Sequence, residues 1–291
     1  MRSVYRRFLI CYHKDYEEKI YKDRKRSGMM SKKGIVSFDL DMTLLNHEDW
    51  SIPASAMDAI EALREKYHIV IASGRDMDHH YSSHYKELIR PDAIIHTNGT
   101  RVTVDGKIIF EHFMDRGLLR RLIDFSGGKP YAVGLTIGSD DYYVNPEIVV
   151  KHDEIRWKDS VRNFKEPQAL YDAEIRTLTF IGNEQSVREL EHEFPELKFP
   201  MFAGGTGADV VEKEVSKAEG LKMLCTHYGI DLSRTVAFGD SMNDYEIVRE
   251  AGIGVAMGNA IEPLKKVADY VTDHIRDDGI WKGCVALGLL K

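Results

Sequence analysis

The sequence has few of the features that mark secreted, membrane-spanning or disordered proteins. Its 291 residues include only three cysteines, which are scattered and have no metal-binding spacing. We therefore expect no disulfide framework, and a reducing, cytoplasmic setting. Only eight prolines and no biased tract occur, and 43% of the residues are hydrophobic, so the chain can bury a sizeable core. No apolar run approaches the ~20 residues of a membrane helix.

A net positive charge is limited to the first 28 residues. Residues 1–28 carry a net charge of +5, whereas the remaining chain carries −12. An acidic body argues against nucleic acid as the main partner, because phosphate backbones are bound by clustered cations. We expect residues 1–28 to be a dispensable basic extension. Contact of this extension with RNA or an anionic surface is the alternative.

The order of apolar runs predicts an α/β protein with an insertion. Short buried strands alternate with helices up to about residue 98 and again from Lys217, which is typical of a doubly wound parallel sheet. Between these parts, Asp105-Gly106 separates two alternating runs and predicts a hairpin. We therefore predict a core formed by residues 29–101 and 204–291, with an α+β domain inserted at residues 102–203.

Polar side chains follow several of the predicted strands of the core. Asp39 and Asp41 follow the first strand, Ser73-Gly74 the second, and Asp240 a later one. Open α/β sheets bind ligands at the carboxyl ends of their strands, and clustered carboxylates suit Mg²⁺. Each motif alone has an ordinary explanation: a capping pair, a helix N-cap or a simple turn. Lys217, which opens a helix, is in isolation an ordinary surface lysine.

Taken together and in this order, these motifs resemble the haloacid dehalogenase superfamily of phosphatases, in particular its Cof-like branch with a large α/β cap. The resemblance spans residues ~34–285, and over the insertion it covers only size and strand pattern. The matching segments are Phe38-Asp39-Leu40-Asp41-Met42-Thr43-Leu44, Ser73-Gly74-Arg75, Asn98-Gly99-Thr100, Val215-Ser216-Lys217, Phe238-Gly239-Asp240-Ser241-Met242-Asn243-Asp244, Ala256-Met257-Gly258-Asn259-Ala260 and Ala268-Asp269-Tyr270-Val271-Thr272.

The resemblance implies a Rossmann-like core and a two-step phosphoryl transfer. Asp39 would be the nucleophile that forms an aspartyl-phosphate, and Asp41 the general acid and base. The same resemblance implies a Mg²⁺ site made by the carboxylates of Asp39 and Asp240 and the backbone carbonyl of Asp41. The residues implied to bind the phosphoryl group are Thr43, Ser73, Gly74 and Lys217, and those implied to support the site are Asn243, Asp244 and Asn259.

One position departs from the family pattern. Met42 stands where the family usually has glycine. If this position required a positive φ, methionine would be strained by roughly 1–2 kcal/mol. We expect instead that the position merely tolerates glycine, and that Met42 costs little and shapes the mouth of the site.

The expected activity is hydrolysis of small phosphorylated metabolites, such as sugar phosphates, with Mg²⁺ as cofactor. The nearest alternative is a phosphomutase or phosphotransferase, which would pass the phosphoryl group on instead of giving it to water. A non-catalytic phosphate-responsive regulator is a further alternative, but the insertion and the presence of Asp41, Lys217 and Asp240 argue against it. We expect no nucleic-acid or membrane partner, and a monomer or weak homodimer.

Overall fold

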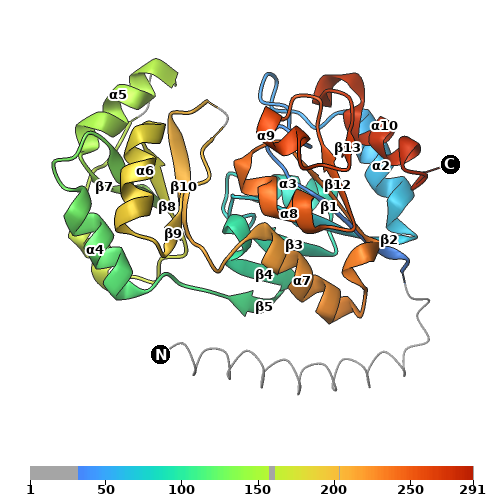
Figure 1. Ribbon diagram of the computed structural model, residues 1–291, viewed down its shortest axis with the longest axis horizontal. Coiled ribbons are helices and arrows are strands. Elements are labelled where there is room, and N and C mark those ends of the chain that lie inside the picture. The colour runs from blue at the N-terminus through green and yellow to red at the C-terminus, as the bar shows by residue number, and fades with distance from the viewer. Residues whose placement is uncertain (1–31, 157–160, 203, 291) are drawn as a thin grey trace.

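The computed structural model describes residues 32–156, 161–202 and 204–290. They form a larger and a smaller body, joined by two chain segments (Figure 1). The predicted basic extension, residues 1–28, lies outside the described residues. Within the described part of the chain, no helix has both the length and the apolar character needed to cross a membrane.

The larger body is built on an eight-stranded sheet with the order β13-β12-β11-β1-β2-β3-β4-β5. The strands from β13 to β3 are parallel, and β4 and β5 continue the sheet as an antiparallel hairpin. Their bounds are β1 (Gly34–Phe38), β2 (Tyr67–Ala72), β3 (Ala93–His96), β4 (Arg101–Val104), β5 (Lys107–Glu111), β11 (Thr235–Gly239), β12 (Ile253–Ala256) and β13 (Tyr270–Val271).

Helices cover both faces of this sheet. Helices α2 and α10 pack against each other, as do α7 and α8 on the opposite side of the strands (Figure 1). Every residue of β1 is buried, as a central parallel strand requires. The helices of the larger body are α2 (Ala54–Arg64), α3 (Ser83–Ile89), α7 (Lys217–Tyr228), α8 (Tyr245–Glu250), α9 (Glu262–Lys265) and α10 (Gly279–Ala286).

The smaller body contains a five-stranded antiparallel sheet with the order β7-β6-β8-β10-β9. One of its faces packs with α4 and α6 in a separate hydrophobic core, and α5 packs against the other. The elements are α4 (Arg116–Ser126), β6 (Ala132–Ile137), β7 (Asp140–Val144), α5 (Pro146–Arg156), β8 (Leu178–Ile181), α6 (Glu184–Glu193), β9 (Leu197–Lys198) and β10 (Gly207–Glu212).

The doubly wound parallel sheet and the inserted α+β unit that the sequence predicts are both present, but the predicted limits of the insertion, 102 and 203, are wrong at both ends. The hairpin of residues 101–111 extends the large sheet, because β4 pairs with β3. Strand β10, residues 207–212, belongs to the small sheet, because it pairs with β8 and β9. The chain therefore passes between the two sheets near residues 112–115 and 213–216.

The turn after β1 corrects the expectation for Met42. This residue has a φ of 59°, so the position does require the left-handed conformation that favours glycine. The turn is closed on both sides: the Met42 N–H donates to the Leu45 carbonyl at 2.8 Å, and the Asn259 side chain donates to the Met42 carbonyl at 2.7 Å. The surrounding structure thus holds methionine in a strained conformation.

Met42→Gly should therefore stabilise the protein, by about 1 kcal/mol, because glycine adopts a positive φ without steric cost. Urea unfolding of the variant and the unchanged protein measures this difference. Met57→Gly is the matched control: Met57 lies within α2, where glycine should cost about 1 kcal/mol. A destabilised Met42→Gly variant would show that the methionine side chain contributes more through packing than it loses through strain.

Candidate active site

Carboxylates from two neighbouring strands meet at the carboxyl edge of the large sheet. Asp39 follows β1, and Asp240 follows β11, which pairs with β1 in parallel register. Asp244 closes the turn after β11, where its Oδ2 accepts the N–H groups of Asp240 and Ser241 at 3.0 and 3.2 Å. All three carboxylates are 5% exposed or less. The predicted juxtaposition of Asp39 with Asp240 is thus present.

A single buried ammonium group links these carboxylates. Lys217 Nζ donates to Asp39 Oδ1 and to Asp244 Oδ1, each at 2.7 Å, although the lysine is only 1% exposed. The lysine is the first residue of α7, whose N-terminus is capped by the Ser216 hydroxyl. Burial by itself lowers the pKa of Lys217, but Asp244 and Asp39 outweigh it and raise that pKa, so the lysine is charged.

The remaining negative charge in the pocket is poorly compensated. Burial raises the pKa of Asp39 to about 8. Lys217 opposes this rise, whereas the nearby carboxylates of Asp244 and Asp41 add to it. Burial and the neighbouring carboxylates also raise the pKa of Asp240. Among the described residues, the Asp240 carboxylate accepts one long hydrogen bond, from the Thr43 hydroxyl at 3.4 Å. Such a buried, underbonded carboxylate fits a bound cation.

Asp41 is half-buried and is held from two sides. Arg75 donates to its two oxygens at 2.7 and 2.5 Å, and His47 Nε2 donates to its Oδ1 at 2.7 Å. Burial alone would raise the pKa of Asp41, but the hydrogen bonds from His47 and Arg75 lower it. In this structure the Asp41 side chain is therefore an ionised carboxylate.

The other predicted residues surround this centre at different depths. Ser73 is fully buried, and its hydroxyl accepts the Arg75 N–H at 3.1 Å. Asn243 donates to Asn98 Oδ1 at 3.1 Å. Asn259, by contrast, supports the Met42 turn and also accepts the Ile275 N–H at 3.0 Å, so its side chain contacts none of the clustered carboxylates.

Asp209 and Asn98 also belong to this site, although the sequence predicted no role for either. In β10, Ala208 and Val210 point into the core of the smaller body, so Asp209 between them faces the opposite side. There its Oδ2 accepts a hydrogen bond from Asn98 Nδ2 at 2.8 Å and lies beside Gly74. Burial raises the pKa of Asp209 to about 6. Asp209 is thus a carboxylate of the smaller body at the active site of the larger one.

The close approach of the Asn98 turn to α7 depends on glycine. Gly99 has a φ of 95°, and a Cβ atom there would lie 2.1 Å from the Ser216 carbonyl oxygen. Only glycine permits this contact, which places Asn98 next to the beginning of the helix that carries Lys217. Asn98 follows the end of β3 by two residues, so it lies just beyond the carboxyl end of a parallel strand, as Asp39, Ser73 and Asp240 do.

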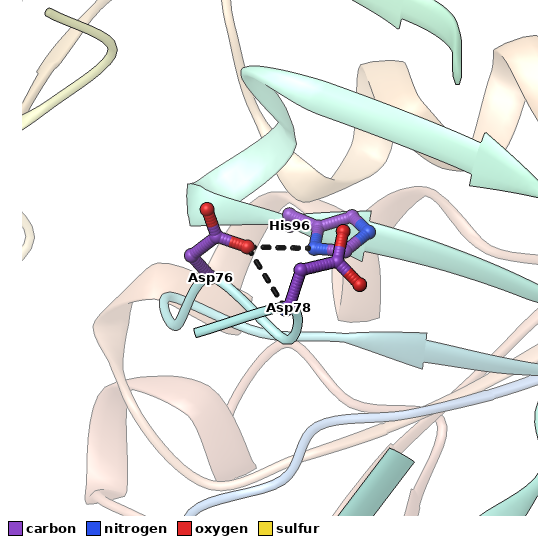
Figure 2. Close-up of side chains that lie close together, drawn as sticks. All are labelled: Asp76, Asp78 and His96. Atoms are coloured by element: carbon purple, nitrogen blue, oxygen red, sulfur yellow. Dashed lines mark hydrogen bonds and ion pairs between the residues drawn. The ribbon is translucent and has the colours of Figure 1, made fainter. Parts of the chain in front are cut away.

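The described residues contain three groups of side chains close enough to share a metal ion: Asp39 with Asp240 and Asp244, Asp76 with Asp78 and His96, and His112 with Glu212 and Glu214. Figure 2 shows the second group, in which an oxygen of Asp76 faces the His96 ring. Its carboxylates are already paired, because Arg101 Nη2 lies 2.6 Å from Asp76 and 2.7 Å from Asp78.

The three groups differ in how fully nearby cations balance their carboxylates. Asp78 also pairs with Lys86, so two cations balance the two carboxylates of the second group. In the third group, His112 pairs with Glu212, and together they connect the two segments that join the bodies. The group at Asp39 and Asp240 is the buried one, and it has a carboxylate without an adequate partner. It is therefore the group whose residues best fit a divalent cation.

Comparison with known proteins identifies the family. The family model for haloacid dehalogenase-like hydrolases matches residues 36–283. The chain is 30% identical over 270 residues to "Putative phosphatase YkrA" of Bacillus subtilis, covering 88% of this chain and 98% of that protein. It is 26% identical to a phosphoglycolate phosphatase of Methanobrevibacter smithii, covering 84% of this chain and 94% of that protein.

Two solved structures have the same fold over nearly their whole length. One is the subclass IIB sugar phosphatase BT4131, with a TM-score of 0.78 and 28% identity, covering 88% of this chain and 100% of that one. The other is the phosphatase BT1666 of Bacteroides thetaiotaomicron, with a TM-score of 0.80 and 27% identity, covering 91% and 98%. The predicted family and fold class are thus confirmed, and the chain belongs to the haloacid dehalogenase-like hydrolases, in which it is a phosphoric monoester hydrolase.

Proposed function

We propose that this phosphatase hydrolyses small phosphorylated metabolites, sugar phosphates or similar esters, with Mg²⁺ and through an aspartyl-phosphate on Asp39. The main support is the environment of Asp39, a buried carboxylate at a strand end between the charged Lys217 and the underbonded Asp240. The likeness to a structure described as a sugar phosphatase supports this substrate class.

The carboxylates of Asp39 and Asp240 and the backbone carbonyl of Asp41 would hold the Mg²⁺ ion. Hard oxygen ligands of this kind suit Mg²⁺, which usually takes only one or two protein carboxylates. When bound there, Mg²⁺ supplies positive charge that keeps the carboxylates ionised and reduces their repulsion of a phosphate. Asp244 is the less suitable ligand, because Lys217 and two backbone N–H groups already occupy its oxygens.

In the first step, Asp39 attacks the phosphorus atom and the bond to the leaving oxygen breaks. Lys217 holds Asp39 Oδ1, so Oδ2 is the attacking oxygen. Asp41 is ionised while Arg75 and His47 hold it, so it takes part in this step in its protonated form, which the second step regenerates. It gives that proton to the leaving oxygen, which needs it most when that oxygen would otherwise depart as an alkoxide. Lys217, Thr43, Ser73 and Gly74 bind and orient the phosphoryl oxygens.

In the second step, water attacks the phosphorus atom of the aspartyl-phosphate. Asp41 takes the proton of that water, and the bond between phosphorus and Asp39 breaks, which regenerates both carboxyl groups. Asn243 and Asp244 keep the site in place: Asn243 through its bond to Asn98, and Asp244 through its bond to Lys217.

Asp209 extends this proposal to the leaving group. Its Oδ2 is bonded to Asn98, whereas Oδ1 has no hydrogen-bond donor among the described residues. A carboxylate oxygen that lacks a donor and lies beside the active site can accept a hydrogen bond from a hydroxyl group of a polyol or sugar. This arrangement favours hydroxylated leaving groups over apolar ones.

Replacement of the nucleophile tests the proposed reaction. Asp39→Asn should lower phosphate release from a panel of sugar phosphates with Mg²⁺ to less than ~1% of the original rate, because an amide does not form the covalent intermediate. Thermal melting should show that the variant remains folded. Turnover well above this level would exclude Asp39 as the phosphoryl acceptor.

Asp240→Asn separates the metal ligand from the other acidic groups. In EDTA at pH 7.5 it should raise the melting temperature by about 2–4 °C, because it removes a buried charge without adequate partners, and the further rise caused by Mg²⁺ should disappear. Asp76→Asn is the control, and it should lower the melting temperature by leaving Arg101 underpaired while keeping the response to Mg²⁺. If only Asp76→Asn abolished that response, the metal would belong to the second group.

Asp209→Asn should show a pH-dependent gain in stability. Because the pKa of Asp209 is raised from 3.8 to about 6, its ionised form destabilises the folded protein above pH ~6, and this cost vanishes as the pH falls toward ~4. The variant should be more stable by about 1–2 kcal/mol at pH 8 and by only about a third of that at pH 4.5, where Asp209 is mostly protonated in the folded protein. Urea unfolding at both pH values measures this, and a gain that is independent of pH would contradict the burial of a charged Asp209.

A further inference from the structure

A short loop beside the active site carries a side chain that contacts Asp41, the proposed general acid and base. Residues 46–51 form a closed turn, in which the Asn46 N–H donates to the Ser51 carbonyl at 2.9 Å. From this turn His47 reaches back to Asp41, with 2.7 Å between His47 Nε2 and Asp41 Oδ1. Neither the strand-end motifs nor the proposed reaction assigns a role to this histidine.

The His47 ring is itself held in place. Trp50 stacks on it, with ring centroids 4.7 Å apart and an angle of 20° between the planes. Trp50 is 46% exposed and has a φ of 56°. A bulky residue in the left-handed region is a strained exception, and such strain persists where the surrounding structure maintains it, often at functional sites.

The two partners of Asp41 come from different parts of the chain. Arg75 follows β2 and contacts both oxygens of the carboxylate, whereas His47 contacts Oδ1 alone from the loop after β1. The Arg75 guanidinium is permanently charged and forms an ion pair with Asp41. The hydrogen bond from His47 restrains the Asp41 carboxylate from a second side, so its orientation is set by the segments that follow both β1 and β2.

We propose that His47, supported by the Trp50 ring, is a positioning residue that orients the Asp41 carboxyl group for proton transfer. This inference rests on the proposed role of Asp41. In the first step the proton on Asp41 moves to the leaving oxygen as the phosphorus–oxygen bond breaks, and in the second step Asp41 receives a proton from water. His47 takes part in neither bond change and acts only through the orientation of Asp41.

Two esters of similar shape test this role. Phenyl phosphate releases a basic phenolate that needs a proton, whereas p-nitrophenyl phosphate releases a stable anion that hardly needs one. The single-turnover rate of aspartyl-phosphate formation isolates the first step for each ester. Loss of a correctly oriented acid should therefore slow phenyl phosphate selectively.

Three variants divide the side chains of the loop. His47→Phe keeps a ring that can stack on Trp50 but removes the donor, and it should slow the first step about tenfold for phenyl phosphate and less than ~2-fold for p-nitrophenyl phosphate. His47→Gln restores a donor and should recover most of the lost rate. Trp50→Ala should show the same selectivity as His47→Phe, at a smaller size. KM should change little in each.

Asp41→Asn, measured in the same way, distinguishes failure of this inference from failure of the proposed reaction. If Asp41→Asn is selective for phenyl phosphate but His47→Phe slows both esters equally or neither, the positioning role is wrong and the reaction stands. If Asp41→Asn itself shows no selectivity, Asp41 is not the general acid and both ideas fall. A change confined to KM in His47→Phe would also overturn the positioning role, because it would place His47 in substrate binding.

Discussion

The arrangement of the active site depends on one buried ammonium group. Lys217 joins a carboxylate after β1 to a carboxylate in the turn after β11, with 2.7 Å to each. A buried charge of this kind is tolerated only when its partners are fixed in place. The same lysine occupies one oxygen of Asp39 and one of Asp244, and two backbone N–H groups occupy the other oxygen of Asp244, so residues of the same type have different surroundings.

Charge compensation, more than composition, distinguishes the acidic groups of this protein from one another. Asp76 and Asp78 are as close together as the active-site carboxylates, but Arg101 lies between them. Asp240 is more deeply buried and has a single weak donor among the described residues. The number of carboxylates does not distinguish these groups, whereas the hydrogen bonds that the carboxylates accept do.

Strand-end position made much of this arrangement predictable from the sequence. Parallel strands place their carboxyl ends at one edge, so Asp39, Ser73 and Asp240 could be assigned to a common region before any coordinates were considered. The interruption of the alternating strand and helix pattern between residue ~98 and Lys217 likewise predicted an inserted α+β unit.

The errors arose where a local pattern fits two tertiary arrangements. The hairpin at residues 101–111 and strand β10 could each extend either sheet, and only their partners decide which. The φ of Met42 is set by the turn that Leu45 and Asn259 close, and the side chain gives no sign of it. Asp209 was missed because its importance comes from a contact with Asn98, 111 residues away along the chain.

The contact between the two joining segments has a mechanical consequence. His112 and Glu212 tie these segments together, so they mark a line about which the smaller body would turn if its contacts Lys198–Glu246 and Asp209–Asn98 opened. Asp209 precedes Glu212 by three residues, a distance of about 10 Å along a strand, and has a short lever arm. Helix α5 is at the far end of the smaller body (Figure 1) and would travel furthest. Such a swing would widen the gap between the two bodies far from the joining segments, whereas the carboxylate of Asp209 would move little. In the proposed role of Asp209, the entry of a substrate and the recognition of its leaving group would then depend on different parts of the smaller body.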